Sequence, residues 1–402
     1  MRPQPGISAG GKQRKSLSRF CAWLIAVAAV PAFGQSEAVK NPALDAAFQA
    51  LSALELGQGL DTFGAIDQAV SQSRLDETIR ADLESRLAAV LRGGATALAK
   101  DYACRQLAIV GSDASTAVLA ELLPDARLSY MARYALEGIG SQAAIQRLRE
   151  MLGKTQGRQK IGVVVSLGSL CDAAAVPALA GMLDDKDREL REAALTAVGR
   201  IGTVEAARIL QSFASTASET ERNAAIDAEL DAAESLCRHG QHEAAAAVCE
   251  RLLAADSERT RAAAYRGLIA AKPAEKLTMI QAGLAAEASW KRTVAADCLV
   301  SLEKGEEIEA IASRIAEFPP AGKLAALQSL KDRSHPAVRK AALVALDHPD
   351  AAHRTAALAA LIAAGTAEDV PRLAELASRA ADREVQSAAL ETLRLMPAAG
   401  TA

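Results

Sequence analysis

Apolar and polar residues along this chain recur with the period of a helix, and the clearest example is the octet at 191–198. Its sequence is Arg-Glu-Ala-Ala-Leu-Thr-Ala-Val, so the small apolar residues at 193, 194, 197 and 198 fall on one stripe. Most of the stripe is alanine, which combines the best helix propensity with a minimal side chain. The octet therefore predicts a helix that packs closely against a neighbouring helix.

The same octet pattern returns through most of the chain. Close copies begin at 222, 261, 323, 354 and 386, and weaker copies begin at 100, 129, 160 and 292. We call these first residues the anchors. Six of the nine intervals between consecutive anchors are 31 residues, and the others are 29, 39 and 32. A steady period between about 20 and 50 residues is typical of a solenoid, in which each repeat packs on its neighbours.

Each octet is preceded by a second helical segment, such as 174–183 before the octet at 191. Pro177 falls in the first turn of that segment, where the missing amide hydrogen costs nothing. A short charged link at 184–187 separates the two helices, and Gly202 ends the second one. Each repeat is therefore predicted to contain helix A, a link, helix B and a terminating glycine.

Residues 1–34 have the pattern of a signal peptide. Basic residues up to Arg19 precede an apolar run at 20–30, and the small residues Ala32 and Gly34 offer cleavage sites. Because the run is shorter than the ~20 apolar residues that span a bilayer, we expect cleavage and export to the bacterial periplasm or cell envelope, with no membrane span afterwards. Residues 35–95 then form an N-terminal helical cap, 96–396 the solenoid and 397–402 a C-terminal tail.

The charge balance excludes two classes of partner. Without residues 1–34 the chain keeps 41 basic and 49 acidic residues, a net charge of about −8. Nucleic acid and anionic membrane surfaces attract cationic proteins. We therefore expect no nucleic-acid partner and no general membrane binding, and we expect protein partners instead.

Five cysteines follow the signal peptide, and an odd number in an exported chain argues against a disulfide framework. Cys104 and Cys298 take slots that the octet at 191–198 fills with leucine and alanine, so we expect both to be small buried residues.

The longest repeat, 222–260, contains Cys237, His239, His242 and Cys249. If helices meet at a turn near 240, the two thiols lie about 4 Å and 13 Å from that turn along the helix axes, at about 1.5 Å per residue. A structural zinc site needs four converging ligands, so we predict no metal and no cofactor. The chain also lacks nucleophile-elbow, phosphate-loop and haem-attachment motifs, which indicates no enzyme activity.

The sequence of the repeats resembles that of a known family. Val176-Pro-Ala-Leu, Asp184-Asp-Lys-Asp, Leu190-Arg-Glu-Ala-Ala-Leu and Ala197-Val-Gly-Arg-Ile-Gly resemble bacterial HEAT repeats of the phycobilin-lyase-like kind over about 96–396. The resemblance implies an all-α, right-handed α-solenoid of about ten helical hairpins. HEAT-type iron hydroxylases use several His-Glu dyads, whereas this chain has one, at 242–243. Such arrays serve unrelated systems, so the family does not fix the function.

Two sets of residues are candidates for a role. Residues one and five positions after each anchor project away from the apolar stripe, and recognition-type residues are densest in the first repeats. The predicted partner-binding residues are Asp101, Arg105, Tyr130, Arg133 and Tyr134. The alternative is that they are ordinary surface residues with one packed tyrosine.

The anchor arginines could line a cationic groove, but acids in the links favour an internal ladder. Asp187, for example, lies four residues before Arg191. Arginine suits a bridge between such a carboxylate and the adjoining link carbonyls across stacked units. The predicted structural ladder consists of Arg191, Arg222, Arg261, Arg292 and Arg354.

Together these patterns predict an exported, non-catalytic scaffold that mediates protein–protein interactions through the surface of its repeats. The stretch 101–171 also resembles HEAT arrays of large exported bacterial proteins, some of which continue into a sugar-hydrolase-like domain. The alternative function is therefore a regulatory or substrate-presenting part of a split envelope enzyme, in a sugar hydrolase or oxidoreductase system.

Overall fold

The structure is a computed structural model that describes residues 41–55 and 63–396. The predicted signal peptide (1–34) and C-terminal tail (397–402) lie outside the described residues. Within these ranges the chain forms 22 α-helices and no strand. None of the described helices is both long enough and apolar enough to cross a membrane.

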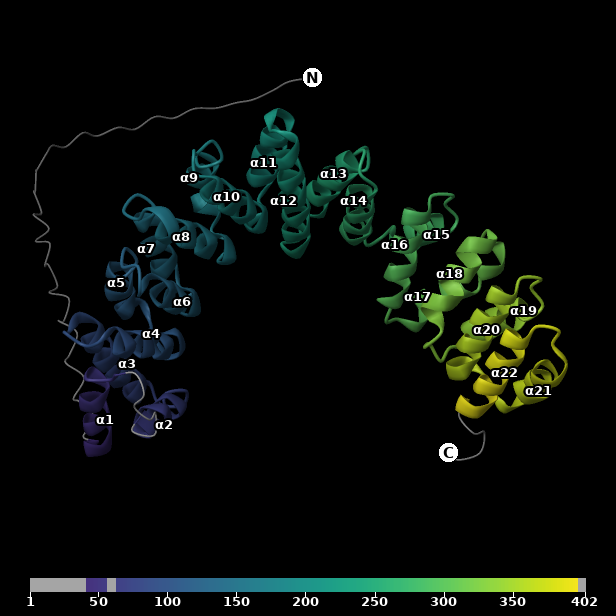
Figure 1. The fold of residues 1–402 in the computed structure, drawn as a ribbon, viewed down its shortest axis with the longest axis horizontal. Helices are drawn as coiled ribbons and strands as arrows, with labels where there is room; N and C mark the ends of the chain where they lie inside the picture. The colour runs from purple at the N-terminus through teal and green to yellow at the C-terminus, as the bar shows by residue number, and fades with distance from the viewer. Residues whose placement is uncertain (1–40, 56–62, 397–402) are drawn as a thin grey trace, which may run out of the picture.

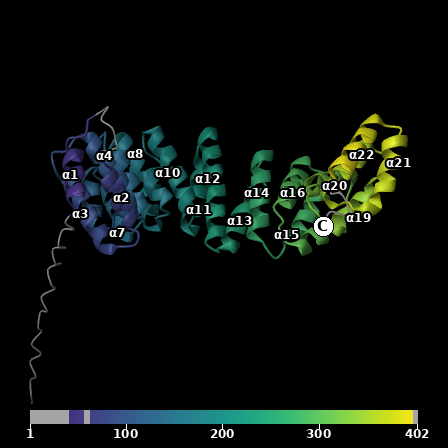
Figure 2. The same ribbon diagram turned by 90° about the horizontal axis from the view of Figure 1, so that it is seen from below.

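The helices form two layers of a long arch, which Figure 1 shows from the side and Figure 2 along its edge. The B layer contains α4 (Ala97–Val110), α6 (Ser129–Ile139), α8 (Gly157–Ser169), α10 (Arg188–Ile201), α12 (Glu219–Arg238), α14 (Glu258–Ala271), α16 (Ser289–Val300), α18 (Pro320–Leu330), α20 (Ala351–Ala364) and α22 (Arg383–Leu395). Each B helix packs against the next one. All ten predicted anchors lie in these helices, and the predicted α-solenoid is confirmed.

The A layer pairs with the B layer. It contains α5 (Asp113–Glu121), α7 (Gln142–Met151), α9 (Val176–Ala180), α11 (Val204–Thr216), α13 (His242–Leu252), α15 (Lys276–Leu284), α17 (Gly305–Ala312), α19 (Pro336–Ala345) and α21 (Val370–Arg379). From α5 to α14 the A helices lie on the outer side of the arch and the B helices on its inner, concave side (Figure 1).

Three helices precede the first repeat: α1 (Pro42–Ser52), α2 (Gly64–Gln72) and α3 (Glu77–Arg92). Short 3-10 turns η2 (Ala173–Ala175), η3 (Ile315–Glu317) and η4 (Ala367–Asp369) accompany α9, α17 and α21. Since α3 packs against both α4 and α5, it covers the end of the array that the first repeat would otherwise expose.

Small residues bring the B helices close together. A Cβ atom on Gly168 would lie 2.7 Å from the Cα of Ala197, and one on Gly199 would lie 2.7 Å from the carbonyl oxygen of Ala228. Gly202 ends α10 in the left-handed conformation, with φ +55, which glycine adopts without strain. The alanine-rich stripe seen in the sequence is therefore the contact surface between stacked repeats.

The apolar core consists of two clusters of buried residues that meet at α14. Leu268 and Ala271 belong to the cluster that runs back to α1, whereas Tyr265 and Ile269 belong to the cluster that runs on to α22. The long repeat that precedes this junction owes its extra length to α12, which has 20 residues.

All five cysteines of the described chain are free. Cys104 is buried, as its slot in the octet indicates. Cys298 is only partly buried, because it lines a surface hollow together with Arg266 and Asp297. The expectation that Cys298 is a fully buried residue is wrong for that reason.

Candidate functional site

The first candidate site is the exposed stripe of the B helices near the N-terminus. Its position follows from the fold, because the A helices cover the opposite side of each B helix and leave this stripe facing the inside of the arch (Figure 1). Tyr130 and Tyr134 on α6 are 65% and 50% exposed. On α4, Arg105 forms an ion pair of 3.0 Å with Asp101. Four of the five predicted partner-binding residues thus lie together on two adjacent helices.

Arg133, the fifth predicted residue, points into the packing between repeats. Its Nη1 donates to the carbonyl oxygen of Gly162 (3.2 Å) and to the hydroxyl of Ser166 (3.3 Å). Its guanidinium also lies 5.6 Å from the centre of the Tyr130 ring, and burial lowers the pKa of Arg133. Arg133 therefore joins α6 to α8 and holds the ring of Tyr130, and it is not a free surface cation.

Three apolar residues outside the predicted set extend this surface. Leu98 and Ile109 on α4 and Val165 on α8 are exposed, and they lie on the same helix stripe as the tyrosines. We define the aromatic patch as Leu98, Ile109, Tyr130, Tyr134 and Val165. On α4 the positions one and five residues after the anchor are 101 and 105. Leu98 lies one helix turn before 101, and Ile109 lies one helix turn after 105. The sequence pattern therefore predicts both residues once the stripe is extended to the ends of the helix.

The aromatic patch ends at the next repeat. The corresponding stripe carries Glu192 and Thr196 on α10 and Asp227 on α12, all of them exposed and polar. Contiguous exposed apolar surface marks interaction sites more often than scattered single residues do. The patch is thus a local feature of the first three repeats.

The anchor arginines hold the links between helices A and B. In four repeats one guanidinium nitrogen, Nη1, donates to the carbonyls six and five residues earlier. The distances are 2.7 and 3.3 Å for Arg191, 2.8 and 2.8 Å for Arg261, 2.8 and 2.5 Å for Arg292, and 2.8 and 2.7 Å for Arg354. Arg222 donates to Ala214 (3.2 Å) and Ala217 (3.4 Å). Each arginine therefore closes its own link.

The link acids have a different role from the one expected. Asp187 accepts from the backbone amide of Glu189 (2.9 Å) and Asp350 from that of Ala352 (3.2 Å), so both cap the N-terminus of helix B. Arg191 instead pairs with Glu221 of the following repeat at 3.0 Å. The expected ion pair between the arginine and the link acid is thus wrong at Arg191. Asp187 instead accepts a hydrogen bond from a backbone amide at the start of helix B.

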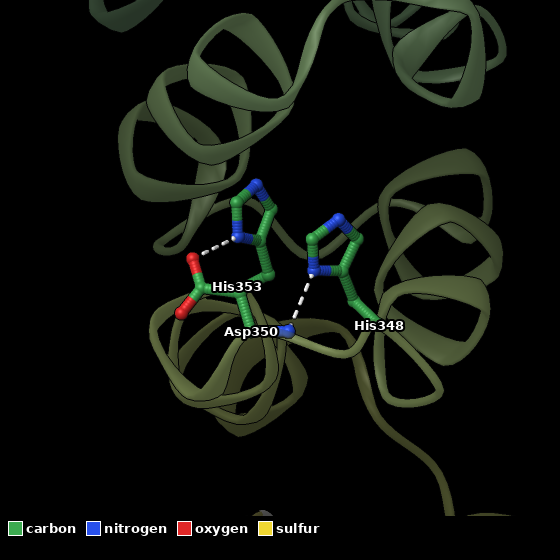
Figure 3. A group of neighbouring side chains, drawn as sticks. All are labelled: His348, Asp350 and His353. Atoms are coloured by element: carbon green, nitrogen blue, oxygen red, sulfur yellow. Dashed lines mark hydrogen bonds and ion pairs between the residues drawn. The ribbon is translucent and has the colours of Figure 1, made fainter.

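A second candidate site lies in the link between α19 and α20, where His348, Asp350 and His353 converge (Figure 3). The two imidazole rings stack, with centroids 3.8 Å apart. His353 is buried; its Nδ1 lies 2.9 Å from Asp350 Oδ2 and its Nε2 lies 2.8 Å from the Pro320 carbonyl oxygen. His348 Nδ1 accepts from the amide of Asp350 at 3.1 Å.

These hydrogen bonds engage three of the four ring nitrogens of the cluster. The amide of Ala352 and the ring of His353 hold the pKa of Asp350 below its usual range, so this side chain is an ionised acceptor. Both ring nitrogens of His353 are thus already engaged, one by Asp350 and one by Pro320. The cluster as built fastens the link to α18. In the sequence this cluster is marked by the spacing of Asp350 and His353, three residues apart at the start of helix B. The repeat pattern alone does not distinguish this spacing.

Comparison with known proteins identifies the repeat type. Residues 158–229 and 308–394 match the family described as HEAT repeats. These two stretches contain HEAT repeats. The predicted resemblance is confirmed for these stretches, and none of the curated proteins matches the chain.

Solved structures with a similar fold are distant in sequence. Human deoxyhypusine hydroxylase in complex with glycerol is 20% identical, with a TM-score of 0.29 over 63% of this chain and 96% of that one. The CpcE–CpcF complex of phycocyanin lyase from Nostoc sp. PCC7120 is 21% identical, with a TM-score of 0.32 over 56% and 91%. Karyopherin Kap121p bound to the SUMO protease Ulp1p is 13% identical, with a TM-score of 0.41 over 88% and 49%. This chain spans about half of the karyopherin, and the likeness concerns the fold alone.

The cysteine and histidine residues of the long HEAT unit do not form a reactive group. Burial raises the pKa of Cys249 to about 12 and also raises the pKa of Cys237. Such thiols stay protonated and are poor nucleophiles and poor metal ligands. His239 contacts the carbonyl oxygen of Ser235 at the end of its own helix (2.8 Å). The segment thus closes a helical hairpin.

Proposed function

We propose that this protein is an exported, non-catalytic scaffold whose HEAT units bind a protein partner in the bacterial periplasm or at the cell envelope. The observation that carries the proposal is the aromatic patch. Five exposed apolar residues gather on α4, α6 and α8, where the corresponding stripe of α10 and α12 is polar. Tyrosine is enriched at the energetic centres of protein interfaces.

The geometry of the patch suits a protein ligand. The guanidinium of Arg133 contacts the Tyr130 ring and is itself fixed by its hydrogen bond to Gly162 on α8. Because the Tyr130 side chain is already held in place, it loses little conformational entropy when a partner binds. On α4 the ion pair of Arg105 and Asp101 lies between Leu98 and Ile109, so the patch combines apolar residues with a polar pair, as protein interfaces commonly do. The export part of the proposal is supported by the signal-peptide pattern of residues 1–34.

Affinity capture with the mature chain from its own envelope extract tests this function. The test variant is the double substitution Tyr130→Ser and Tyr134→Ser. The matched control is Val300→Ser with Leu390→Ser, which removes two apolar residues exposed elsewhere (57% and 53%). We expect a partner that the wild type and the control retain and the patch variant loses.

A partner that binds the patch variant as well as the wild type would contradict the role of the patch. Capture of an enzyme whose activity depends on this chain would favour the alternative, a regulatory or substrate-presenting part of a split envelope enzyme. Activity assays on the captured complex, with and without this chain, distinguish the two functions.

A further inference from the structure

An apolar hollow of the C-terminal half lies between neighbouring A helices. A cavity of about 580 Å³ opens between α17 with η3 and α19, and α18 forms its floor. Ala312, Ile315 and Leu327 are buried at its base, while Val344 on α19 is 59% exposed at its wall. Cavities of about 300–1,000 Å³ with apolar walls are typical of sites for small ligands.

This HEAT unit has a lysine at its anchor, as the units that begin at 100 and 160 also have. Where Arg191, Arg261 and Arg354 bind link carbonyls, the unit of α18 has Lys323, which lines the cavity. Lys323 makes no side-chain hydrogen bond or ion pair with any of the described residues, and Lys340 on α19 likewise makes none. Two ammonium groups without a protein partner thus border one apolar cavity.

The charges around the cavity leave an excess of positive charge. Two carboxylates line it, but Asp347 is paired with Arg372 at 2.6 Å. Glu309 remains as the single carboxylate against Lys323 and Lys340. The ring nitrogens of His353 already contact Asp350 and Pro320, so they are not available to bind a ligand. A ligand that completes this lining therefore carries an apolar body and one negative charge.

We propose that this cavity binds a small amphipathic carboxylate, with its apolar body against Ile315, Leu327 and Val344 and its carboxylate between Lys323 and Lys340. The ammonium groups supply charge-assisted hydrogen bonds, and the buried base supplies apolar contact. The site is separate from the aromatic patch, so it adds a ligand-binding function to the proposed scaffold and does not rest on it.

Isothermal titration calorimetry with decanoate tests the proposal on the mature chain. Decanol and decyltrimethylammonium have a similar apolar body with no charge or the opposite charge. We expect decanoate to bind with one-to-one stoichiometry and at least about tenfold more tightly than either analogue, since one charge-assisted contact is worth about that factor. Equal binding of the three ligands, or no binding of decanoate, would overturn the proposal.

Variants locate the site. The substitutions Lys323→Gln and Lys340→Gln together should weaken decanoate about tenfold or more and leave decanol unchanged. The matched control is Lys331→Gln, an exposed lysine of the same region outside the cavity. Val344→Asp, at an exposed position, tests the apolar wall if the double variant fails to fold. Loss of affinity in the control equal to that in the double variant, or binding of an acidic peptide in place of decanoate, would overturn the proposal.

The aromatic-patch variant keeps the two proposals apart. Because α6 is remote from α18 along the array (Figure 1), Tyr130→Ser with Tyr134→Ser should bind decanoate as the wild type does. A loss of decanoate binding in that variant would contradict the placement of the site at α17–α19.

Discussion

The two ends of the array are built from the same kind of helical hairpin, but they expose different surfaces. In the N-terminal repeats the exposed stripe of α4, α6 and α8 carries the aromatic patch, and these helices lie on the concave side of the arch (Figure 1). In the C-terminal units an apolar cavity with two lysines opens instead between the A helices α17 and α19. The aromatic patch includes Tyr130 and Tyr134, and Lys323 lines the cavity. We expect positions that differ between repeats to select ligands, while small residues such as Gly168 and Gly199 hold the B helices together.

The substitution with the largest expected effect is Gly199→Val, which tests the close packing between neighbouring B helices. A Cβ atom at this position would lie 2.7 Å from the Ala228 carbonyl oxygen and 3.0 Å from its Cα, so α10 and α12 would have to move apart. We expect a loss of about 3 kcal/mol in the free energy of unfolding, measured by urea denaturation. The control is Gly153→Val, where the added atom would meet nothing within 4 Å. Equal destabilisation by the two substitutions would contradict the close-packing account.

The anchors supply a direct contrast between an arginine and a lysine at the same position of the repeat. Arg261→Met removes two hydrogen bonds, to the carbonyls of Ala255 and Asp256 in the same link, so we expect a loss of about 1–2 kcal/mol in the free energy of unfolding. Lys323→Met removes no such bond and should change stability by less than about 0.5 kcal/mol. If both variants are destabilised equally in thermal and urea unfolding, Lys323 is a structural anchor like the arginines.

Acid should weaken the C-terminal units through Asp369. Arg339 pairs with this buried carboxylate at 2.7 Å, and that contact, with the amide of Thr366, lowers the pKa of Asp369. A carboxylate with a lowered pKa stabilises the fold above its ordinary value of about 4, and the stabilisation is lost as the pH falls through the lowered value. We expect Asp369→Asn to reduce the difference between urea unfolding at neutral pH and at pH values below about 4. An unchanged pH dependence would show that the pair contributes nothing.

The aromatic patch should contribute little to stability. Tyr130 and Tyr134 are exposed, so replacing both by serine should change the free energy of unfolding by less than about 1 kcal/mol in total. The same variant should lose partner binding by a factor of about ten or more, because interface tyrosines carry a large share of the binding energy. A large fall in the melting temperature would instead assign the tyrosines to packing.

Much of the fold was predictable because helix periodicity is a local property. The anchors from 100 to 386 could be located from the octet alone, and each lies in a B helix. The site was predictable only in part. Tyr130 and Tyr134 follow from their place on the stripe, but the inward direction of Arg133 depends on Gly162 of the next unit, where a Cβ would lie 2.5 Å from the guanidinium. The cavity is lined by residues of α17, α18 and α19. Because these helices belong to more than one repeat, the pattern of a single repeat does not predict the cavity.

The central claim is that a protein partner binds the aromatic patch and leaves the C-terminal cavity free. Hydrogen exchange of the captured complex, compared with the free chain, tests it most directly. We predict slower amide exchange in 97–169, which holds α4, α6 and α8, and unchanged exchange in 305–353. Protection confined to 305–353, with none in 97–169, would contradict the claim.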